Sequence, residues 1–209
     1  MPYGEPREAC RSDPQSCRHK GGVMQGIIFT ALSDMVIERL GIETWDQLLD
    51  EAQLPSQGVY TSGGRYDDTE LLRLVGLLTA RTGIPAPDLV RSFGEFLFAK
   101  LYASLPPNLQ QCTDLRQFLL AIDGTIHKEV KRVYPDSYLP SFVCDDSNPQ
   151  QLTMQYRSMR KLCHAAEGLI AGAAVQFGSH VSIEHPVCMH QGAEHCTLIV
   201  KFDTAKASE

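Results

Sequence analysis

The amino-acid sequence predicts an α+β protein in which a helical N-terminal part precedes a C-terminal part that combines strands with helix. Apolar residues recur at the spacing of an amphipathic helix from Met24 to about residue 134. After Pro140 the pattern changes, because apolar and polar residues alternate one by one, as along a half-buried strand. The chain has 209 residues, which suits one domain and is long enough to bury a core.

The first 23 residues follow neither pattern. They are rich in proline and glycine and contain no apolar run of the kind found in a secretory signal. We therefore expect residues 1–23 to form a disordered N-terminal extension and residues 24–209 to form a single domain. One hypothesis is that Met24 is the true start of the protein. The alternative is a real tail whose Cys10 and Cys17 bind or oxidise.

Five helices are expected before Pro135. Gly41 is a plausible end for the first, and Thr44 with Gln47 resembles a capping box that opens the second. The third is marked by the apolar residues from Leu71 to Leu78 and ends at Gly83. The fourth begins at Pro87, and the fifth ends before Pro135. In this part of the chain we expect helices at 24–40, 45–53 and 113–134 and loops at 55–66 and 105–111.

The C-terminal part begins with an alternating segment in which Leu152, Met154 and Tyr156 are separated by polar residues. We expect a helix at about 161–177 and two further strands, at 181–184 and 197–202. The connection between those two strands is too long and polar for a tight hairpin. The single domain therefore divides into a helical part, about 24–135, and a sheet-containing part, about 136–203.

Charge and hydropathy exclude two classes of function. The 25 acidic residues outnumber the 19 Lys and Arg residues, for a net charge of −6, whereas nucleic-acid binding relies on clustered positive charge. No apolar run is long enough to span a bilayer; the best candidate, 162–177, contains His164 and Glu167. We expect no nucleic-acid partner and no membrane partner.

His127 lies on a largely apolar face of the predicted helix 113–134. Gly124, one turn earlier, leaves room beside the imidazole for a flat group. An imidazole at an apolar position can bind haem iron through one ring nitrogen. The alternative is a core histidine with a hydrogen-bonded partner.

Tyr156, Ser158 and Arg160 are spaced two residues apart. In a strand this spacing places all three side chains on one face. Two hydroxyls and a planar guanidinium then form a clamp for a carboxylate. The alternative is an ordinary solvated strand face.

From Met24 to about Phe202 the chain resembles the bacterial H-NOX domains (haem nitric oxide/oxygen binding), relatives of the haem domain of soluble guanylate cyclase. The resemblance is carried by MQGIIF at Met24, by IHKEV around His127, by YRSMR from Tyr156 to Arg160 and by Pro140. It implies a four-stranded antiparallel sheet, with haem b between the sheet-containing and helical parts. His127 would be the axial ligand, the Tyr-x-Ser-x-Arg motif would hold the haem propionates, and Pro140 would press on the porphyrin.

The resemblance also indicates which gas is bound. Oxygen-binding members carry a tyrosine where this chain has Ala165 and a supporting asparagine where it has Leu97. Bound O₂ needs a hydrogen-bond donor, whereas NO binds ferrous haem without one. We therefore expect NO, and also CO, as ligands. His164 would change this expectation if it entered the pocket. The expected lining of the gas-binding side is Ile28, Leu32, Leu97, Ala165 and Leu169.

Cys163, His185, Cys188 and Cys196 form a second candidate site. Three thiolates and one imidazole suit a tetrahedral structural Zn²⁺, and some H-NOX proteins of this branch resemble the chain in carrying such a site. His190 or His195 could replace His185. The alternatives are unbound thiols or a redox switch that forms disulfides. Cys112 and Cys144 lie outside the set.

These features predict a non-enzymatic, cytoplasmic sensor in which NO breaks the iron–histidine bond and the change is read by a separate enzyme. The resemblance implies that this partner is a histidine kinase or an enzyme that makes or degrades cyclic di-GMP. A zinc-and-thiol redox sensor that uses the cysteine-rich site is the alternative. A metal-dependent hydrolase built on His127 is a third hypothesis, which no metal-binding His-Glu-x-x-His pair supports.

Overall fold

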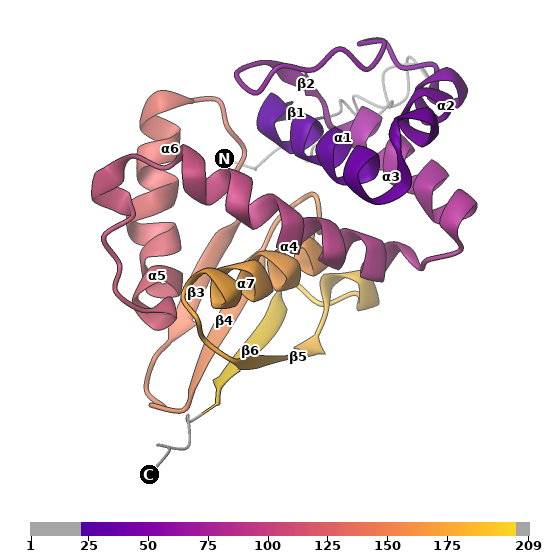
Figure 1. Ribbon diagram of the computed structural model, residues 1–209. Helices are drawn as coiled ribbons and strands as arrows, with labels where there is room; N and C mark the ends of the chain where they lie inside the picture. The colour runs from indigo at the N-terminus through magenta and orange to yellow at the C-terminus, as the bar shows by residue number, and fades with distance from the viewer. Residues whose placement is uncertain (1–21, 204–209) are drawn as a thin grey trace, which may run out of the picture.

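The computed structural model describes residues 22–203, and its mixture of helices and a four-stranded antiparallel sheet confirms the predicted α+β class (Figure 1). The N-terminal part is mainly helical. Strands β1 and β2 form a two-stranded antiparallel pair beside it. Its elements are β1 (Val23–Gln25), α1 (Gly26–Leu40), α2 (Ile42–Ala52), β2 (Arg65–Asp67), α3 (Asp68–Thr82) and α4 (Ala86–Ser104).

The C-terminal part contains the larger sheet, in which the strand order is β3-β4-β6-β5 and every neighbouring pair is antiparallel. A 3₁₀ turn at Pro107–Leu109 and a π-helical turn at Ile122–Ile126 precede it, and a second 3₁₀ turn at Met189–Gln191 joins β5 to β6. The remaining elements are α5 (Leu115–Ala121), α6 (His127–Val133), β3 (Ser141–Asp145), β4 (Gln151–Arg157), α7 (Cys163–Gln176), β5 (Val181–Val187) and β6 (Cys196–Phe202).

The buried apolar side chains form two cores that meet along α4. The first core is built from α1, α2, α3 and α4 and includes Leu97. The second, which includes Phe98, is built mainly from α5, α7, β4 and β6. Figure 1 shows α4 crossing between the group α1–α3 and α7, and α7 lying between α4 and the sheet. Leu169 of α7 packs against both cores, so this helix lies at their border.

Two glycines allow α4 and α7 to approach each other at backbone distance. A Cβ atom on Gly94 would lie 2.3 Å from the carbonyl oxygen of Ala165, and one on Gly168 would lie 1.9 Å from that of Arg91. Both separations are far below van der Waals contact, so neither position accepts a side chain without moving a backbone. The two parts of the molecule are therefore joined by a tight helix pair.

The folded part of the chain begins before Met24. Val23 pairs with Asp67 in the β1–β2 ladder, and the carbonyl of Gly22 accepts a hydrogen bond from the backbone N–H of Asp68. Assigning Gly22 and Val23 to the N-terminal extension was therefore wrong. The predicted disorder of the preceding residues, and the hypotheses on Cys10 and Cys17, lie outside the described residues.

Two other local predictions were wrong. The second helix begins at Ile42, and the Thr44 hydroxyl donates to the carbonyl of Leu40 instead of capping a helix start. The helix expected at 113–134 is divided by the π-helical turn, which ends one residue before His127. Within residues 22–203, no helix is both long enough and apolar enough to cross a membrane.

Candidate functional site

His127 is the first residue of α6, directly after the π-helical turn. Its side chain is 18 % exposed. The Nδ1 atom is buried and has no hydrogen-bond partner, and the nearest carboxylate oxygen, Oδ1 of Asp123, is 3.6 Å away. A buried polar nitrogen without a partner is unusual and needs an explanation. Burial lowers the pKa of His127, and Asp123 and the Pro140 backbone oppose this shift only in part. The imidazole is therefore neutral at pH 7, the form that binds a metal ion.

Aromatic rings connect His127 with the Tyr-x-Ser-x-Arg motif. The ring of Phe142 on β3 lies 6.0 Å from the imidazole and 5.5 Å from the ring of Tyr156, measured between centroids. The structure thus brings the histidine, the Pro140 backbone and the start of the motif together, although they lie on different elements.

The motif itself lies at the end of β4. Tyr156 and Ser158 are buried, while the residue between them, Arg157, is exposed. The expected alternation therefore holds, but the strand ends at Arg157, so placing all three motif residues within one strand was wrong. Burial raises the pKa of Tyr156 to about 12, so its hydroxyl stays protonated at neutral pH.

Arg160 joins the two parts of the molecule. Its Nε atom donates to Oδ2 of Asp68 at 2.6 Å, and its two terminal nitrogens donate to the carbonyls of Tyr138 and Val23. The charged groups of Arg160 and Asp68 are nearly buried, with 14 % and 12 % of their side chains exposed. Sequence reasoning missed Asp68, which lies 92 residues earlier in the chain.

The residues present fit a haem group. His127 supplies an unpartnered, neutral imidazole nitrogen at a buried position. The three hydrogen bonds of Arg160 use three of the five N–H donors of a guanidinium, which leaves one on each terminal nitrogen for a carboxylate. Arg160 lies where the helical and sheet-containing parts meet, because it contacts Asp68 and Val23 of the helical part.

The five side chains expected on the gas-binding side are all apolar. Leu32 and Leu97 are buried in the first core, and Ile28 and Leu169 pack against it. Ala165 lies where α7 meets Gly94 of α4. The structure therefore brings the predicted lining together along α1, α4 and α7.

His164 points toward the cysteine-rich site. Its ring stacks on that of His190 at 5.7 Å and lies 5.7 Å from that of His185. Its Nδ1 atom lies 3.3 Å from Oε1 of Glu167. His164 therefore has its neighbours at the cysteine-rich site and not on the side where the gas is expected to bind.

The four predicted zinc ligands converge. One ligand atom from each of Cys163, His185, Cys188 and Cys196 lies within 4.8 Å of the other three. The Sγ atoms of Cys163 and Cys188 are 3.9 Å apart, close to the ~3.8 Å between two thiolates of a tetrahedral Zn²⁺ with bonds of about 2.3 Å. Burial raises the pKa of Cys163 and Cys196, so these thiols are protonated at neutral pH when no metal is bound.

The two histidines that could replace His185 as a zinc ligand, His190 and His195, have other surroundings. The Nε2 atom of His190 lies 2.8 Å from the carbonyl oxygen of Lys161, and this histidine groups with Cys163 and His164. The Nδ1 atom of His195 is buried without a hydrogen-bond partner. Among the described residues, only His185 joins the three cysteines in one four-residue group.

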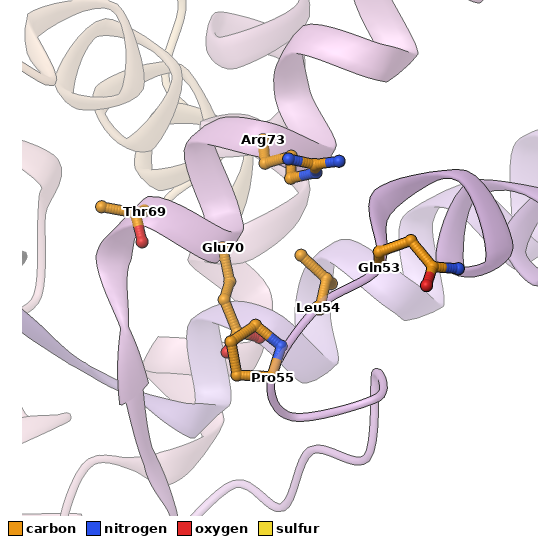
Figure 2. Close-up of a pocket in the computed structure, with 6 residues that line it drawn as sticks. All are labelled: Gln53, Leu54, Pro55, Thr69, Glu70 and Arg73. Carbon is orange, nitrogen blue, oxygen red and sulfur yellow. The ribbon is translucent and has the colours of Figure 1, made fainter.

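Two small cavities lie away from the proposed haem contacts. Figure 2 shows one that is lined by Gln53, Leu54, Pro55, Thr69, Glu70 and Arg73. Its buried carboxylate, Glu70, is already bonded by the hydroxyls of Ser56 and Tyr60, so it holds the loop after α2 in place. The other cavity is bordered by Arg91, Glu167 and His185, next to the cysteine cluster.

A buried imidazole near a Tyr-x-Ser-x-Arg motif is the arrangement expected of a haem-binding gas-sensor domain. The family model described as Haem-NO-binding matches residues 25–185. The chain therefore belongs to the Haem-NO-binding, or H-NOX, family.

Solved structures of this family are similar along most of the chain. An H-NOX protein from Shewanella oneidensis, in the Fe(II)NO ligation state, is 36 % identical with a TM-score of 0.82, covering 87 % of this chain and all of that one. The Fe(II) unliganded H-NOX protein from K. algicida is 33 % identical with a TM-score of 0.80, covering 89 % of this chain and all of that one.

A curated relative is much longer. The soluble guanylate cyclase gcy-32 of Caenorhabditis elegans is 26 % identical over an alignment of 161 residues that covers 72 % of this chain. The match covers 23 % of that cyclase, so the chain corresponds to about a quarter of its length.

Proposed function

We propose that the chain is a haem-based nitric oxide sensor in which His127 is the axial ligand. The observation that carries this proposal is the buried, neutral imidazole whose Nδ1 atom has no hydrogen-bond partner. Tyr156, Ser158 and Arg160 hold the propionates of haem b, and Pro140 packs against the porphyrin. Family membership supports haem binding. The choice of NO as the ligand and the roles of these residues are our proposal.

The apolar lining favours NO, and also CO, over O₂. When bound, ferrous haem supplies an open iron position that binds these gases. Ile28, Leu32, Leu97, Ala165 and Leu169 offer no side-chain donor to a bound O₂ molecule. These side chains exclude water. The preference for NO and CO over O₂ then depends on the intrinsic affinity of each gas for ferrous haem.

His127 would hold the haem iron, and the release of this imidazole on NO binding would begin the signal. The freed imidazole relaxes the π-helical turn, a type of element that is often found at functional sites. This turn contacts β3, where the backbone N–H of Phe142 donates to Asp123, so its movement shifts the sheet relative to the helical part. Ligand binding thus biases a two-state arrangement of the molecule.

We further propose that the output is produced in trans, in the cytoplasm. The chain carries no nucleotide-binding loop motif, and its two candidate sites are assigned here to haem and to Zn²⁺. The partner is then a histidine kinase or a cyclic di-GMP synthase or phosphodiesterase. Cys163, His185, Cys188 and Cys196 bind a structural Zn²⁺ that joins α7, β5 and β6.

Spectroscopy of the full chain tests the haem proposal. Wild-type protein from haem-replete cells is expected to be red, and the Soret band of its ferrous form is expected to shift with NO and CO but not with air. His127→Gly is expected to lose haem and to regain it when free imidazole is added. Colourless wild-type protein, or unchanged haem binding in His127→Gly, would contradict the proposal.

A redox sensor is the second candidate, because the Sγ atoms of Cys163 and Cys188 are close enough to form a disulfide after a small movement. Peroxide treatment followed by mass spectrometry of the peptides separates the candidates. A redox sensor is expected to form the Cys163–Cys188 disulfide reversibly while zinc is released. Retention of zinc and free thiols at peroxide levels that oxidise an exposed thiol would exclude it.

A further inference from the structure

Glu167 is a buried carboxylate beside the proposed zinc site. It lies one helical turn after Cys163 on α7, so the two side chains share a face of that helix. Only 5 % of its side chain is exposed. A carboxylate at such a depth is stable only when it is paired and hydrogen-bonded.

Two groups from other elements are hydrogen-bonded to this carboxylate, and Nδ1 of His164 on α7 itself lies 3.3 Å from Oε1. Nε of Arg91, on α4, donates to Oε2 at 2.6 Å. Nδ1 of His185, on β5, contacts Oε1 at hydrogen-bond distance or closer. Arg91 is itself held by Asp88 at 2.8 Å, so the orientation of Glu167 is set from α4.

The contact decides which nitrogen of His185 carries the proton. A carboxylate only accepts hydrogen bonds, so Nδ1 must be the N–H donor and the lone pair lies on Nε2. Nε2 is buried and has no hydrogen-bond partner. One ring nitrogen of His185 groups with the Sγ atoms of the three cysteines, and because Glu167 occupies Nδ1, Nε2 is the nitrogen left for a metal ion.

We propose that Glu167 is the positioning residue of the zinc site, which holds His185 in the Nδ1–H tautomer and directs Nε2 toward the metal. This inference rests on the proposed zinc site. Carboxylate–histidine–metal arrangements of this kind orient the ring and strengthen its nitrogen as a ligand. The chain Arg91–Glu167–His185 also connects the metal site with α4, in the helical part of the molecule.

A second metal ion between His164, Glu167 and His185 is the competing explanation, because one ligand atom from each lies within 4.8 Å of the others. The observations favour the positioning role. Both oxygens of Glu167 already have partners, and the positive charge of Arg91 opposes a cation at that place.

The affinity for zinc tests the proposal on the full chain, by competition with a chromogenic chelator under reducing conditions. Wild type is expected to bind one zinc ion. Glu167→Ala is expected to bind one zinc ion about 10- to 100-fold more weakly, the usual cost of losing such a partner. Glu184→Gln is the matched control, because Glu184 precedes His185 but is paired with Lys201 on the exposed face, and its affinity is expected to equal that of wild type.

The tautomer of His185 gives a second measurement that does not depend on the variant folding. Long-range ¹H–¹⁵N correlation spectra of metal-free wild type are expected to show His185 protonated at Nδ1. In Glu167→Ala the population at Nε2–H is expected to rise, and Glu167→Gln, which keeps an acceptor oxygen, is expected to lie between the two.

Three results would overturn the inference alone: equal zinc affinity in wild type and Glu167→Ala, protonation of His185 at Nε2 in metal-free wild type, or two zinc ions in wild type that fall to one in Glu167→Ala. A wild-type chain that binds no zinc would instead overturn the proposed zinc site, and this inference with it.

Discussion

At the residue scale, buried histidine nitrogens without partners mark both candidate sites. Nδ1 of His127 and Nε2 of His185 are buried and lack hydrogen bonds, although the burial of such atoms costs free energy. His127 lies near the Tyr-x-Ser-x-Arg motif, which suits haem. His185 lies beside three thiols, which suit zinc. Arg160 has a double role, since it pairs with Asp68 and retains donors for a propionate.

Removal of the guanidinium tests the clamp. Arg160→Ala is expected to release haem roughly 10- to 100-fold faster, because a charge-assisted hydrogen bond contributes about 1.5–3 kcal/mol. Transfer of haem to apomyoglobin measures the rate. Arg157→Ala is the control, since that exposed neighbour lies on the opposite side of the chain. An unchanged rate in a folded Arg160→Ala protein would contradict the role of Arg160.

At the scale of elements, two features shape the site. The π-helical turn before His127 interrupts the long helix that periodicity predicts, and it sets where the imidazole lies. The close contact of α4 with α7 brings Arg91 within reach of Glu167 and places the apolar lining at the border of the two cores. Both features depend on backbone geometry that a side-chain pattern does not describe.

A pair of glycine substitutions tests the helix contact. Gly168→Ala is expected to lower the free energy of unfolding by about 1–3 kcal/mol, because the new methyl group would lie 1.9 Å from the carbonyl oxygen of Arg91. In Gly76→Ala, on the exposed side of α3, the new methyl group meets no atom within 4 Å. This substitution is expected to raise the free energy of unfolding by about 0.5–1 kcal/mol. Urea unfolding measures both. Equal effects would show that α4 and α7 do not pack this closely.

At the scale of the whole molecule, the proposed ligands join separate pieces of chain. Haem would lie between the helical and sheet-containing parts, and zinc would join α7, β5 and β6 through four side chains. Arg160 and the Arg91–Glu167 pair add polar links across the same border. Signal and stability are therefore expected to depend on the same contacts.

Zinc removal is expected to lower the thermal midpoint. A metal ion at 100 times its dissociation constant contributes about 2.7 kcal/mol, and at about 2–4 °C for each kcal/mol its loss corresponds to roughly 5–10 °C. Calorimetry with and without chelator, under reducing conditions, measures the shift. Cys112→Ser is expected to respond like wild type, whereas Cys196→Ala is expected to start lower and not to respond. The same midpoint with and without chelator in wild type would count against a structural zinc ion.

Most of the regular structure could be predicted from the sequence, since periodicity is a local property, whereas the roles of the candidate site residues came from motif spacing together with the family resemblance and stay predictions. Five helices (α1, α2, α3, α4 and α7), three strands of the larger sheet and the end of α3 at Gly83 follow from such patterns. The short strand β2 and the half-buried strand β3 could not be located, because neither has a fully buried face that would give a clear alternation.

By itself, the sequence determined the order and chemistry of the candidate ligands: one histidine on a long helical segment, the Tyr-x-Ser-x-Arg motif, and three cysteines with a histidine. Only the tertiary structure decided that Asp68 pairs with Arg160, that His164 points away from the gas-binding side, and that Glu167 connects Arg91 with His185. The two contacts of Glu167 join residues that are 76 and 18 positions apart. Packing of distant elements fixes such pairs, and local spacing carries no record of them.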